Sequence, residues 1–189
     1  MKNLWISIKI TLAMCVVLFV GYVLVLRLVA WVASPNDGEA PVVTYNGKVV
    51  GAANVGQVFT DSVYFWGRPS NVDYNGGGSG GSNKGTNNPE YLAQVEERID
   101  AFLAAHPYLS REEVPAEMVT ASGSGLDPDI SPRGAQAQVR RVAEARGLDI
   151  ATVRHLVDSL TQKSWLGLFG TEKVNVLRLN VALEELNEN

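Results

Sequence analysis

A glycine-rich segment in the middle of the chain is the first place where residue types and spacing could support chemistry. Residues 76–83 read Gly-Gly-Gly-Ser-Gly-Gly-Ser-Asn and are followed by Lys84, Gly85 and Thr86. Successive backbone N–H groups in such a segment can bind an anion, and a phosphate-binding P-loop ends in Gly-Lys-Ser/Thr. Here the lysine precedes the glycine, so the P-loop order is not met. The composition favours a flexible loop over an anion site.

Nucleophilic and metal chemistry have little support elsewhere in the sequence. Ser122 and Ser124 do not lie in the G-x-S-x-G pattern of a hydrolase nucleophile. His106 precedes a proline and His155 lies on an amphipathic segment, so both are predicted to be structural or solvent-facing rather than catalytic. Two histidines without clustered carboxylates provide no set of metal ligands. We therefore expect no catalytic residue, metal or cofactor of its own.

The element that must position the rest of the chain is an apolar run over residues 10–32. Residues 10–26 carry no charge and would form a helix about 25 Å long at ~1.5 Å per residue. Extending the helix to residue 32 covers a bilayer core of roughly 30 Å, with the Arg27 guanidinium reaching the far interface. Because no small-x-small cleavage site follows, residues 1–33 are predicted to be a retained membrane anchor rather than a signal peptide.

The charges that flank this span predict its orientation. Lys2, Lys9 and the α-amino group precede it, whereas Asp37 and Glu39 follow it. By the positive-inside rule, the N-terminus is expected in the cytoplasm and the rest of the chain outside.

Composition limits the partners of that remaining part. Three of the 16 basic residues and none of the 20 acidic residues lie in residues 1–33, so the rest carries a net charge of about −7. This acidity argues against nucleic acid as a partner. The single cysteine, Cys15, lies inside the span, so no disulfide framework is available.

One α+β domain is predicted to follow the anchor. Residues 34–41 are polar and rich in turn formers, which indicates a linker, and residues 42–189 have a length suited to a single domain. A β-hairpin is expected over residues 42–51 because Asn46 and Gly47 tolerate the two positive φ angles of a type I′ turn.

Three further segments are predicted to be extended. Residues 58–66 are rich in β-branched and aromatic side chains and indicate a strand, with Asp61-Ser62 as a possible interruption. Residues 114–122 also have an extended pattern. Residues 174–183 alternate like a strand in their first half, but their leucine spacing also allows a short terminal helix.

Helices are predicted where a capping residue precedes an apolar pattern of helical spacing. Asn88, Ser131 and Asp149 are the expected N-caps, and Gly147 is expected just beyond the end of the second helix.

The basic residues of these helices are interpreted as surface residues. Arg140, Arg141, Arg146 and Arg154 are predicted to lie on solvated faces rather than to form a binding patch. Residues 166–170 are predicted to form an apolar loop interrupted by glycine.

The sequence resembles one known family along nearly its whole length. The motifs follow one another in a fixed order: Phe65-Trp66-Gly67-Arg68-Pro69-Ser70, Asp73-Tyr74-Asn75, Ser79-Gly80-Gly81-Ser82-Asn83, Asn88-Pro89, Val119-Thr120-Ala121-Ser122-Gly123-Ser124-Gly125-Leu126-Asp127-Pro128, Ile130-Ser131-Pro132, and Val174-Asn175-Val176-Leu177 with Leu179-Asn180. Together with the N-terminal anchor, they resemble the C subunit of Kdp-type potassium-transporting ATPases, the KdpC family. An ordered string of motifs is far more specific than an isolated glycine-rich loop.

The resemblance implies a non-catalytic accessory subunit of a high-affinity bacterial potassium uptake pump. Such a subunit would stabilise the complex and act as a catalytic chaperone that raises the ATP affinity of the pump's P-type subunit. Its implied partners are that ATP-hydrolysing subunit and a channel-like subunit that carries K+, in the bacterial cytoplasmic membrane. ATP is then expected only through the pump complex. The alternative is a free-standing, membrane-anchored binding or sensor domain outside the cytoplasm.

The resemblance also suggests contact residues. For the family a nucleotide contact near a glutamine is proposed, and the candidate here is Gln57. Asp129 and Lys84 depart from the family pattern, which has histidine and an apolar residue at these places. The residues for which a partner-contacting or structural role is implied are Trp66, Gly67, Arg68, Pro69, Ser79, Gly80, Gly81, Ser82, Asn83, Ser122, Gly123, Ser124, Gly125, Asp127 and Pro128.

Two of these segments are expected to be ordered by contact. Glycine-rich backbone is costly to fix, so the loop of residues 71–88 and the turn of residues 122–132 should be held by a partner or by packing on each other.

Overall fold

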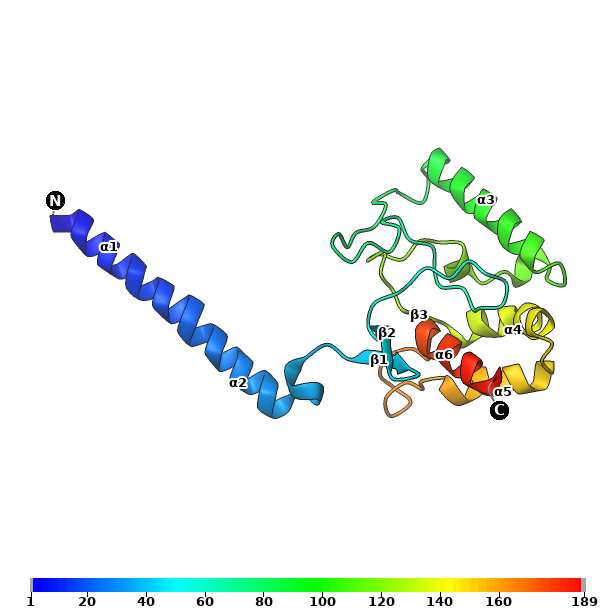
Figure 1. Ribbon diagram of the computed structural model, residues 1–189. Coiled ribbons are helices and arrows are strands. Elements are labelled where there is room, and N and C mark those ends of the chain that lie inside the picture. Colours follow the sequence, from blue (N-terminus) through cyan, green and yellow to red (C-terminus); the bar gives the residue numbers. More distant parts are fainter. Residues whose placement is uncertain (1, 188–189) are drawn as a thin grey trace. The chain divides into compact units, whose positions relative to one another are not determined.

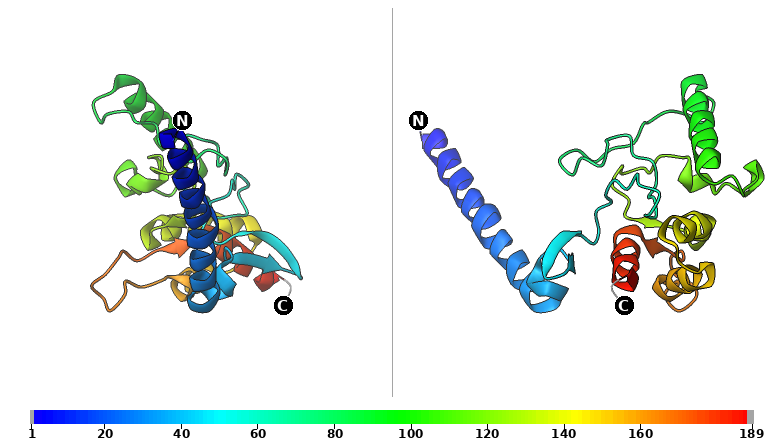
Figure 2. Two further views of the ribbon diagram at one scale, coloured as in Figure 1. Left: turned by 90° about the vertical axis from the view of Figure 1, so that its left-hand side faces the viewer. Right: turned by 45° about the vertical axis from the view of Figure 1, so that its right-hand side comes forward.

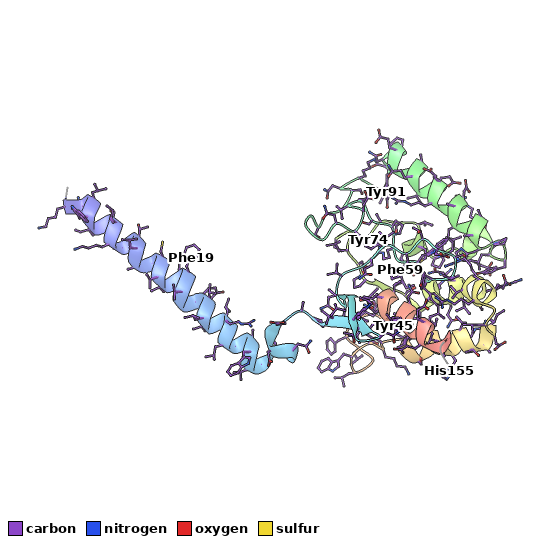
Figure 3. All side chains as sticks on the ribbon, in the orientation of Figure 1. Phe19, Tyr45, Phe59, Tyr74, Tyr91 and His155 are labelled. Carbon is purple, nitrogen blue, oxygen red and sulfur yellow. The ribbon has the colours of Figure 1, made fainter. Side chains whose placement is uncertain are left out.

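The computed structural model describes residues 2–187, and the chain divides into two compact units with the boundary after Pro41. The first unit consists mainly of one continuous helix formed by α1 (Lys2–Cys15), the π-helical segment η1 (Val16–Tyr22) and α2 (Val23–Ala33) (Figure 1). Among the described residues, it is the one helix long and apolar enough to cross a membrane. Its large apolar side chains are exposed, and Phe19 projects away from the helix (Figure 3). These properties agree with the predicted span.

The helix ends in a short 3-10 turn, η2 (Pro35–Gly38). Within it, Asn36 and Asp37 have φ angles of 57° and 53°. Asn and Asp reach this left-handed conformation more readily than other non-glycine residues, which explains why the polar sequence ends the helix here.

The second unit begins with the predicted hairpin. Strand β1 (Val42–Tyr45) pairs antiparallel with β2 (Lys48–Ala52). Asn46 and Gly47 at the turn have φ angles of 49° and 74°, as a type I′ turn requires. The hairpin prediction is confirmed.

The helices of the second unit begin at the predicted caps. The side chains of Asn88, Ser131 and Asp149 accept hydrogen bonds from backbone N–H groups of the following turn. Gly147 ends the second of these helices with a φ of 66°. The helices are α3 (Pro89–Ala105), α4 (Pro132–Arg146), α5 (Ile150–Leu160) and α6 (Val176–Asn187).

Helices α4, α5 and α6 pack together, while α3 lies at the opposite end of this unit, across irregular segments (Figures 1 and 2). A short antiparallel pair, β3 (Asp129–Ile130) and β4 (Val174–Asn175), joins the start of α4 to the start of α6. The core contains fully buried side chains from three helices: Val139, Val142, Val153, Val157, Leu179 and Leu183. Helices combined with short antiparallel strands confirm the predicted α+β class.

Two of the extended predictions are wrong and one open question is answered. Residues 58–66 form no strand but an irregular segment with a turn at residues 61–64. Residues 114–122 include a 3-10 turn, η4 (Ala116–Met118), which follows η3 (Arg111–Glu113). Residues 174–183 are a two-residue strand followed by α6.

The prediction that four helix arginines lie on solvated faces is correct for two of them. Arg140 and Arg154 are exposed, as expected. Arg141 is buried, and the Arg146 side chain is only 4% exposed. These two side chains turn inward because they donate hydrogen bonds to the backbone carbonyl groups of residues 62–64.

Candidate functional site

Four of the motifs contribute to one region of the structure, which we call the loop junction and define as residues 67–83 and 122–128. The Ser122 N–H donates a hydrogen bond to the Pro69 carbonyl over 3.0 Å, although 53 positions separate the two residues. Tyr74 lies within this irregular region, away from the helices α4 to α6 (Figure 3). The sequence singled out the segments, and the structure brings them into contact.

The glycine-rich loop is held against the Ser122 turn by its own backbone. Gly80 N–H donates to the Ser124 carbonyl over 2.9 Å, and the Ser79 hydroxyl donates to the same carbonyl over 3.0 Å. A Cβ at Gly81 would lie 3.1 Å from the Gly123 carbonyl oxygen, so the two backbone segments approach each other closely at a pair of glycines. The expectation that these segments pack on each other is confirmed.

Ser70 fastens the other side of the junction. Its hydroxyl donates to the Gly125 carbonyl over 2.7 Å and accepts from the N–H groups of Val72 and Tyr74. Gly125 has a φ of 68°, and a Cβ there would lie 2.4 Å from Val72 Cγ2. Glycine is therefore required at position 125 by both conformation and space. Ser70 ends the motif of residues 65–70, but nothing in the sequence indicated that its hydroxyl would bind the Gly125 carbonyl.

Arg68 and Asp127 form the ion pair of the junction. Arg68 Nη1 donates to Asp127 Oδ2 over 2.9 Å, while Asp127 Oδ1 accepts from the Asp129 N–H over 3.1 Å. The Tyr74 hydroxyl donates to the Arg68 carbonyl. Burial raises the pKa of Tyr74, and the Asp127 carboxylate raises it further. A Cβ at Gly67 would lie 2.8 Å from the Tyr74 hydroxyl, which explains the glycine beside Arg68.

A charged cleft of about 370 Å³ opens beside this ion pair. It is lined by basic Arg68 and Lys173 and by acidic residues that include Glu117, Asp127 and Asp129. Lys173 Nζ donates to Asp129 Oδ2 over 2.5 Å. Asp129 is thus part of a second ion pair. Within residues 2–187, no cluster of His, Cys, Asp or Glu side chains is arranged to hold a metal ion.

Gln57 lies at a different place from the junction contacts. Its Nε2 donates to the Val50 carbonyl of β2 over 3.0 Å. The preceding residue, Gly56, donates its N–H to the Leu126 carbonyl over 2.8 Å, so the backbone here borders the junction while the Gln57 side chain faces β2. The groove around Gln57 has a volume of about 310 Å³ and is lined by Tyr45, Val50, Phe59, Tyr64, Leu177, Asn180, Val181 and Glu184, of which Tyr45 and Phe59 are labelled in Figure 3.

The remaining motif residues have local structural contacts. The Ser82 hydroxyl accepts from the Lys84 N–H over 3.4 Å, and Asn83 has a φ of 53°. Lys84 forms an ion pair of 3.1 Å with Glu90 at the start of α3. The Pro128 carbonyl accepts from Val176 N–H at the start of α6 over 2.9 Å. 

Two buried amide side chains explain why the predicted strand at residues 58–66 does not form. Asn180 of α6 accepts from the Phe65 N–H over 2.8 Å and donates to the Phe65 carbonyl over 3.0 Å. Gln138 of α4 binds both backbone groups of Trp66 in the same manner, at 2.8 and 3.2 Å. The polar groups that a neighbouring strand would bind are thus satisfied by side chains from two helices.

Arg141 completes the attachment of this segment. Its guanidinium donates to the carbonyls of Ser62 and Tyr64 and to Gln138 Oε1, and it lies 4.1 Å from the centre of the Trp66 ring. Burial lowers the pKa of Arg141 to about 10, so the side chain is still charged at neutral pH. Backbone carbonyls, an amide oxygen and an aromatic face stabilise this buried charge.

His106 is the fourth hydrogen-bond partner of Arg141 and is buried. Arg141 Nε donates to His106 Nε2 over 2.9 Å, so Nε2 carries no proton and the proton on Nδ1 is donated to the Phe102 carbonyl over 2.7 Å. Burial lowers the pKa of His106 to about 4. The sequence predicted a structural or solvent-facing histidine, and it did not indicate that Arg141 would be its hydrogen-bond partner.

Arg146 and the Trp66 ring make further contacts on the irregular segment of residues 58–66. Arg146 Nε donates to the Val63 carbonyl over 2.6 Å, and Arg146 Nη2 pairs with Glu184 of α6 over 2.6 Å. Trp66, with Phe59, Gly67, Pro69, Phe102 and Met118, lines an apolar groove of about 350 Å³ on the α3 side. The arrangement contains structural networks and grooves, and it presents no catalytic geometry among the described residues.

These features define a class of protein: a membrane-anchored α+β domain in which the sequence motifs build a fixed loop junction. Comparisons with known proteins give the family. The family model described as "KdpC: K+-transporting ATPase, c chain" matches residues 4–185. A potassium-transporting ATPase KdpC subunit from Bacteroides fragilis (strain YCH46) is 65% identical over 188 residues, covering 98% of each chain. The subunit of the same name from Flavobacterium psychrophilum is 55% identical, covering 98% of this chain and 100% of its own. The one from Caldanaerobacter subterraneus subsp. tengcongensis is 44% identical, covering 95% of this chain and 93% of its own. The chain belongs to the KdpC family of K+-transporting ATPase subunits.

Proposed function

We propose that the chain is a non-catalytic accessory subunit of an ATP-driven potassium uptake pump. In this proposal it is assembled with an ATP-hydrolysing P-type subunit and a channel-like K+-translocating subunit, which it helps to hold together. The observation that carries the proposal is the family match over residues 4–185, which includes the anchor as well as the domain. The loop junction supports it, because its motif residues are engaged in backbone and ion-pair contacts and not in a catalytic constellation.

Co-purification tests this role. The full chain, tagged at its C-terminus and extracted in mild detergent from cells starved of potassium, should bring down both partner subunits at comparable stoichiometry. Purification of the chain alone under these conditions would contradict the pump assignment and favour the free-standing anchored domain.

The proposed orientation is a single pass with the N-terminus inside and the domain outside. Lys2 and Lys9 before the span and Asp37 and Glu39 after it support this orientation. Gly78 is a suitable reporter, because it is exposed and a Cβ there would meet nothing within 4 Å. In a Cys15→Ser background, Gly78→Cys should react with a membrane-impermeant maleimide in spheroplasts. Reaction only after the cytoplasmic membrane is opened would reverse the orientation.

A catalytic chaperone effect would then be indirect. With the domain outside, Gln57 does not meet cytoplasmic ATP, and the subunit would raise ATP affinity by favouring one conformation of the assembled pump. The bond from Gln57 to the Val50 carbonyl supports a structural role for this side chain. Gln57→Ala should therefore change the KM for ATP of the assembled pump less than about twofold, which is under 0.5 kcal/mol. A much larger change in KM with unchanged assembly would favour direct nucleotide contact.

A further inference from the structure

Residues 164–170, called here the apolar tip, form a tight loop that plays no part in the contacts described above. Trp165 and Phe169 exchange backbone hydrogen bonds of 2.8 and 3.0 Å, and their rings lie 5.5 Å apart. Four large side chains are nevertheless exposed: Trp165 by 68%, Leu166 by 72%, Leu168 by 80% and Phe169 by 59%. Figure 2 (left) shows this orange segment standing out from the second unit.

Such an exposed cluster is costly in water. The other exposed large apolar residues of the second unit lie singly, like Val58 and Leu92, or as the one pair Val49 and Val50, which is common on protein surfaces. The apolar tip instead gathers four in five consecutive positions on a loop whose shape is fixed by its own backbone bonds. Contiguous exposed apolar surface of this kind marks a site of contact with a protein or a membrane.

The base of the apolar tip lies near the point where the chain enters the second unit. Gln162 and Lys173 pair across the base through two backbone bonds of 2.8 and 3.1 Å. Two residues further on, Asn175 Nδ2 donates to the Ala53 carbonyl over 2.8 Å. Ala53 directly follows β2, whose last residue pairs with Val42, the first residue of the unit. The loop base and the domain entry therefore belong to the same part of the fold.

The linker limits how far that entry can be from the bilayer. Residues 34–41 connect the end of the apolar helix to Val42 and, even fully extended at ~3.6 Å per residue, span at most about 29 Å. The domain entry therefore lies no more than about 29 Å from the end of the span, a distance that permits the nearby apolar tip to meet the bilayer surface.

The chemistry of the tip suits the membrane interface. Tryptophan is favoured at the headgroup level, and Leu and Phe side chains can enter the acyl boundary beneath it. Lys163 is exposed directly before the tip, whereas Lys173 at its base is paired with Asp129 and lies beside the exposed Glu172. A basic side chain such as that of Lys163 is attracted to the phosphates of anionic lipids. We infer that residues 164–170 insert into the interfacial layer of the bilayer that holds the anchor, as a second membrane contact that orients the domain.

Site-directed spin labelling of the full chain tests this inference. In a Cys15→Ser background, a label at Leu168→Cys is compared with one at Gln94→Cys, an exposed position on α3. Both proteins are placed in bilayer discs of phosphatidylcholine with phosphatidylglycerol, and collision rates with oxygen and with a water-soluble nickel chelate are measured. We expect the ratio of oxygen to nickel collisions to be several-fold higher at position 168 than at position 94.

Each result has a defined meaning. Equal ratios at the two positions, in discs and in the assembled pump, would overturn the inference. A label at 168 that collides with nickel in discs, but is shielded from both reagents only in the assembled pump, would mean that the tip docks on a protein subunit, which also overturns it. Because the inference depends on the anchor and not on the pump, it can fail while the proposed function stands. Unchanged melting temperatures of both labelled proteins exclude unfolding as the cause.

Discussion

Arg141 is a charged residue in the core, and its surroundings explain how that charge is tolerated. Its hydrogen bonds go to His106, Gln138 and the carbonyls of Ser62 and Tyr64. Removing any one partner leaves a buried donor unsatisfied, which typically costs about 1–3 kcal/mol or more for a charged group. The network therefore fixes the irregular segment against α4 far more specifically than apolar contact would.

His106 should make the stability of the domain depend on pH. Its pKa is about 4 in the folded protein, against about 6.5 in an unfolded chain. Between these values the unfolded chain binds a proton that the folded one does not. The free energy of unfolding is therefore unaffected by this titration above about pH 6.5. It decreases as the pH falls from 6.5 toward 4, by about 3 kcal/mol in total.

The control for this pH effect is His106→Gln, which keeps an acceptor for Arg141 but does not titrate. Urea unfolding of the full chain in detergent at pH 7 and pH 5 should show a larger loss of unfolding free energy for the wild type than for the variant. The comparison cancels the carboxylates that both proteins share. Equal losses in the two proteins would show that His106 does not contribute.

Gln138 offers a second test at the residue scale. Gln138→Leu keeps a similar volume but leaves both backbone groups of Trp66 and one Arg141 donor without their partner. We expect a loss of about 3 kcal/mol or more of unfolding free energy, measured by urea titration. On the same helix, Gln136 bonds Asp158 at the surface, so Gln136→Leu should change stability by less than about 1 kcal/mol. Similar losses in both variants would contradict the conclusion that Gln138 fixes the backbone of Trp66.

Among the structural elements, the loop junction shows how segments without regular structure become fixed. Residues 71–88 have a composition typical of a flexible loop. In the structure, hydrogen bonds from Ser70, Ser79 and Gly80 to the Ser122 turn stabilise one arrangement. Glycine at positions 81 and 125 allows neighbouring backbone segments to approach closely, because a side chain at either position would contact the segment opposite.

The two glycines of the Ser122 turn should respond differently to substitution. Gly125→Ala places a Cβ in a left-handed conformation and against Val72, so a loss of at least about 1–2 kcal/mol is expected. At Gly123 a Cβ would meet nothing within 4 Å and φ is not positive, so Gly123→Ala should stay within about 0.5 kcal/mol. Thermal unfolding of the full chain in detergent measures both. A stable Gly125→Ala protein would disprove the proposed constraint.

At the scale of the whole molecule, the anchor sets where every other contact can occur. Arg27 is the single charged residue between residue 10 and the end of α2. Arginine in a span is unfavourable by about 2.5–3.5 kcal/mol near the bilayer centre, whereas leucine is favourable, so Arg27→Leu should insert at least as well as the wild type. Membrane fractionation after carbonate washing measures insertion. Loss of the variant from the membrane would contradict the anchor interpretation, while intact insertion with lost pump assembly would assign Arg27 to a partner helix.

The net charge of the second unit also acts at this scale. Residues 42–189 contain 13 basic and 18 acidic residues, a net charge of about −5. In the proposed orientation, such a domain near a K+ entrance would raise the local cation concentration modestly, and salt should screen this effect over ~10 Å. If so, raising the ionic strength with a non-transported salt should increase the KM for K+ of the assembled pump slightly, and a KM independent of ionic strength would exclude the effect.

The sequence by itself determined the features that depend on neighbours along the chain. The apolar span, the Asn46-Gly47 turn and the caps at Ser131 and Asp149 are local, because each is fixed by the conformation or hydrogen bonding of a few adjacent residues. The ordered motifs likewise indicated the family before any contact was known.

Only the tertiary structure decided which segments would be irregular and which charges would be buried. Residues 58–66 have strand composition, but Gln138 and Asn180, 72 and 115 positions away from their partners, satisfy the backbone groups that a strand would need. Arg141 was indistinguishable from its exposed neighbour Arg140 until the packing of α4 placed one guanidinium among buried carbonyls. Both outcomes depend on contacts between residues distant in sequence, and a local pattern of polarity and spacing does not contain that information.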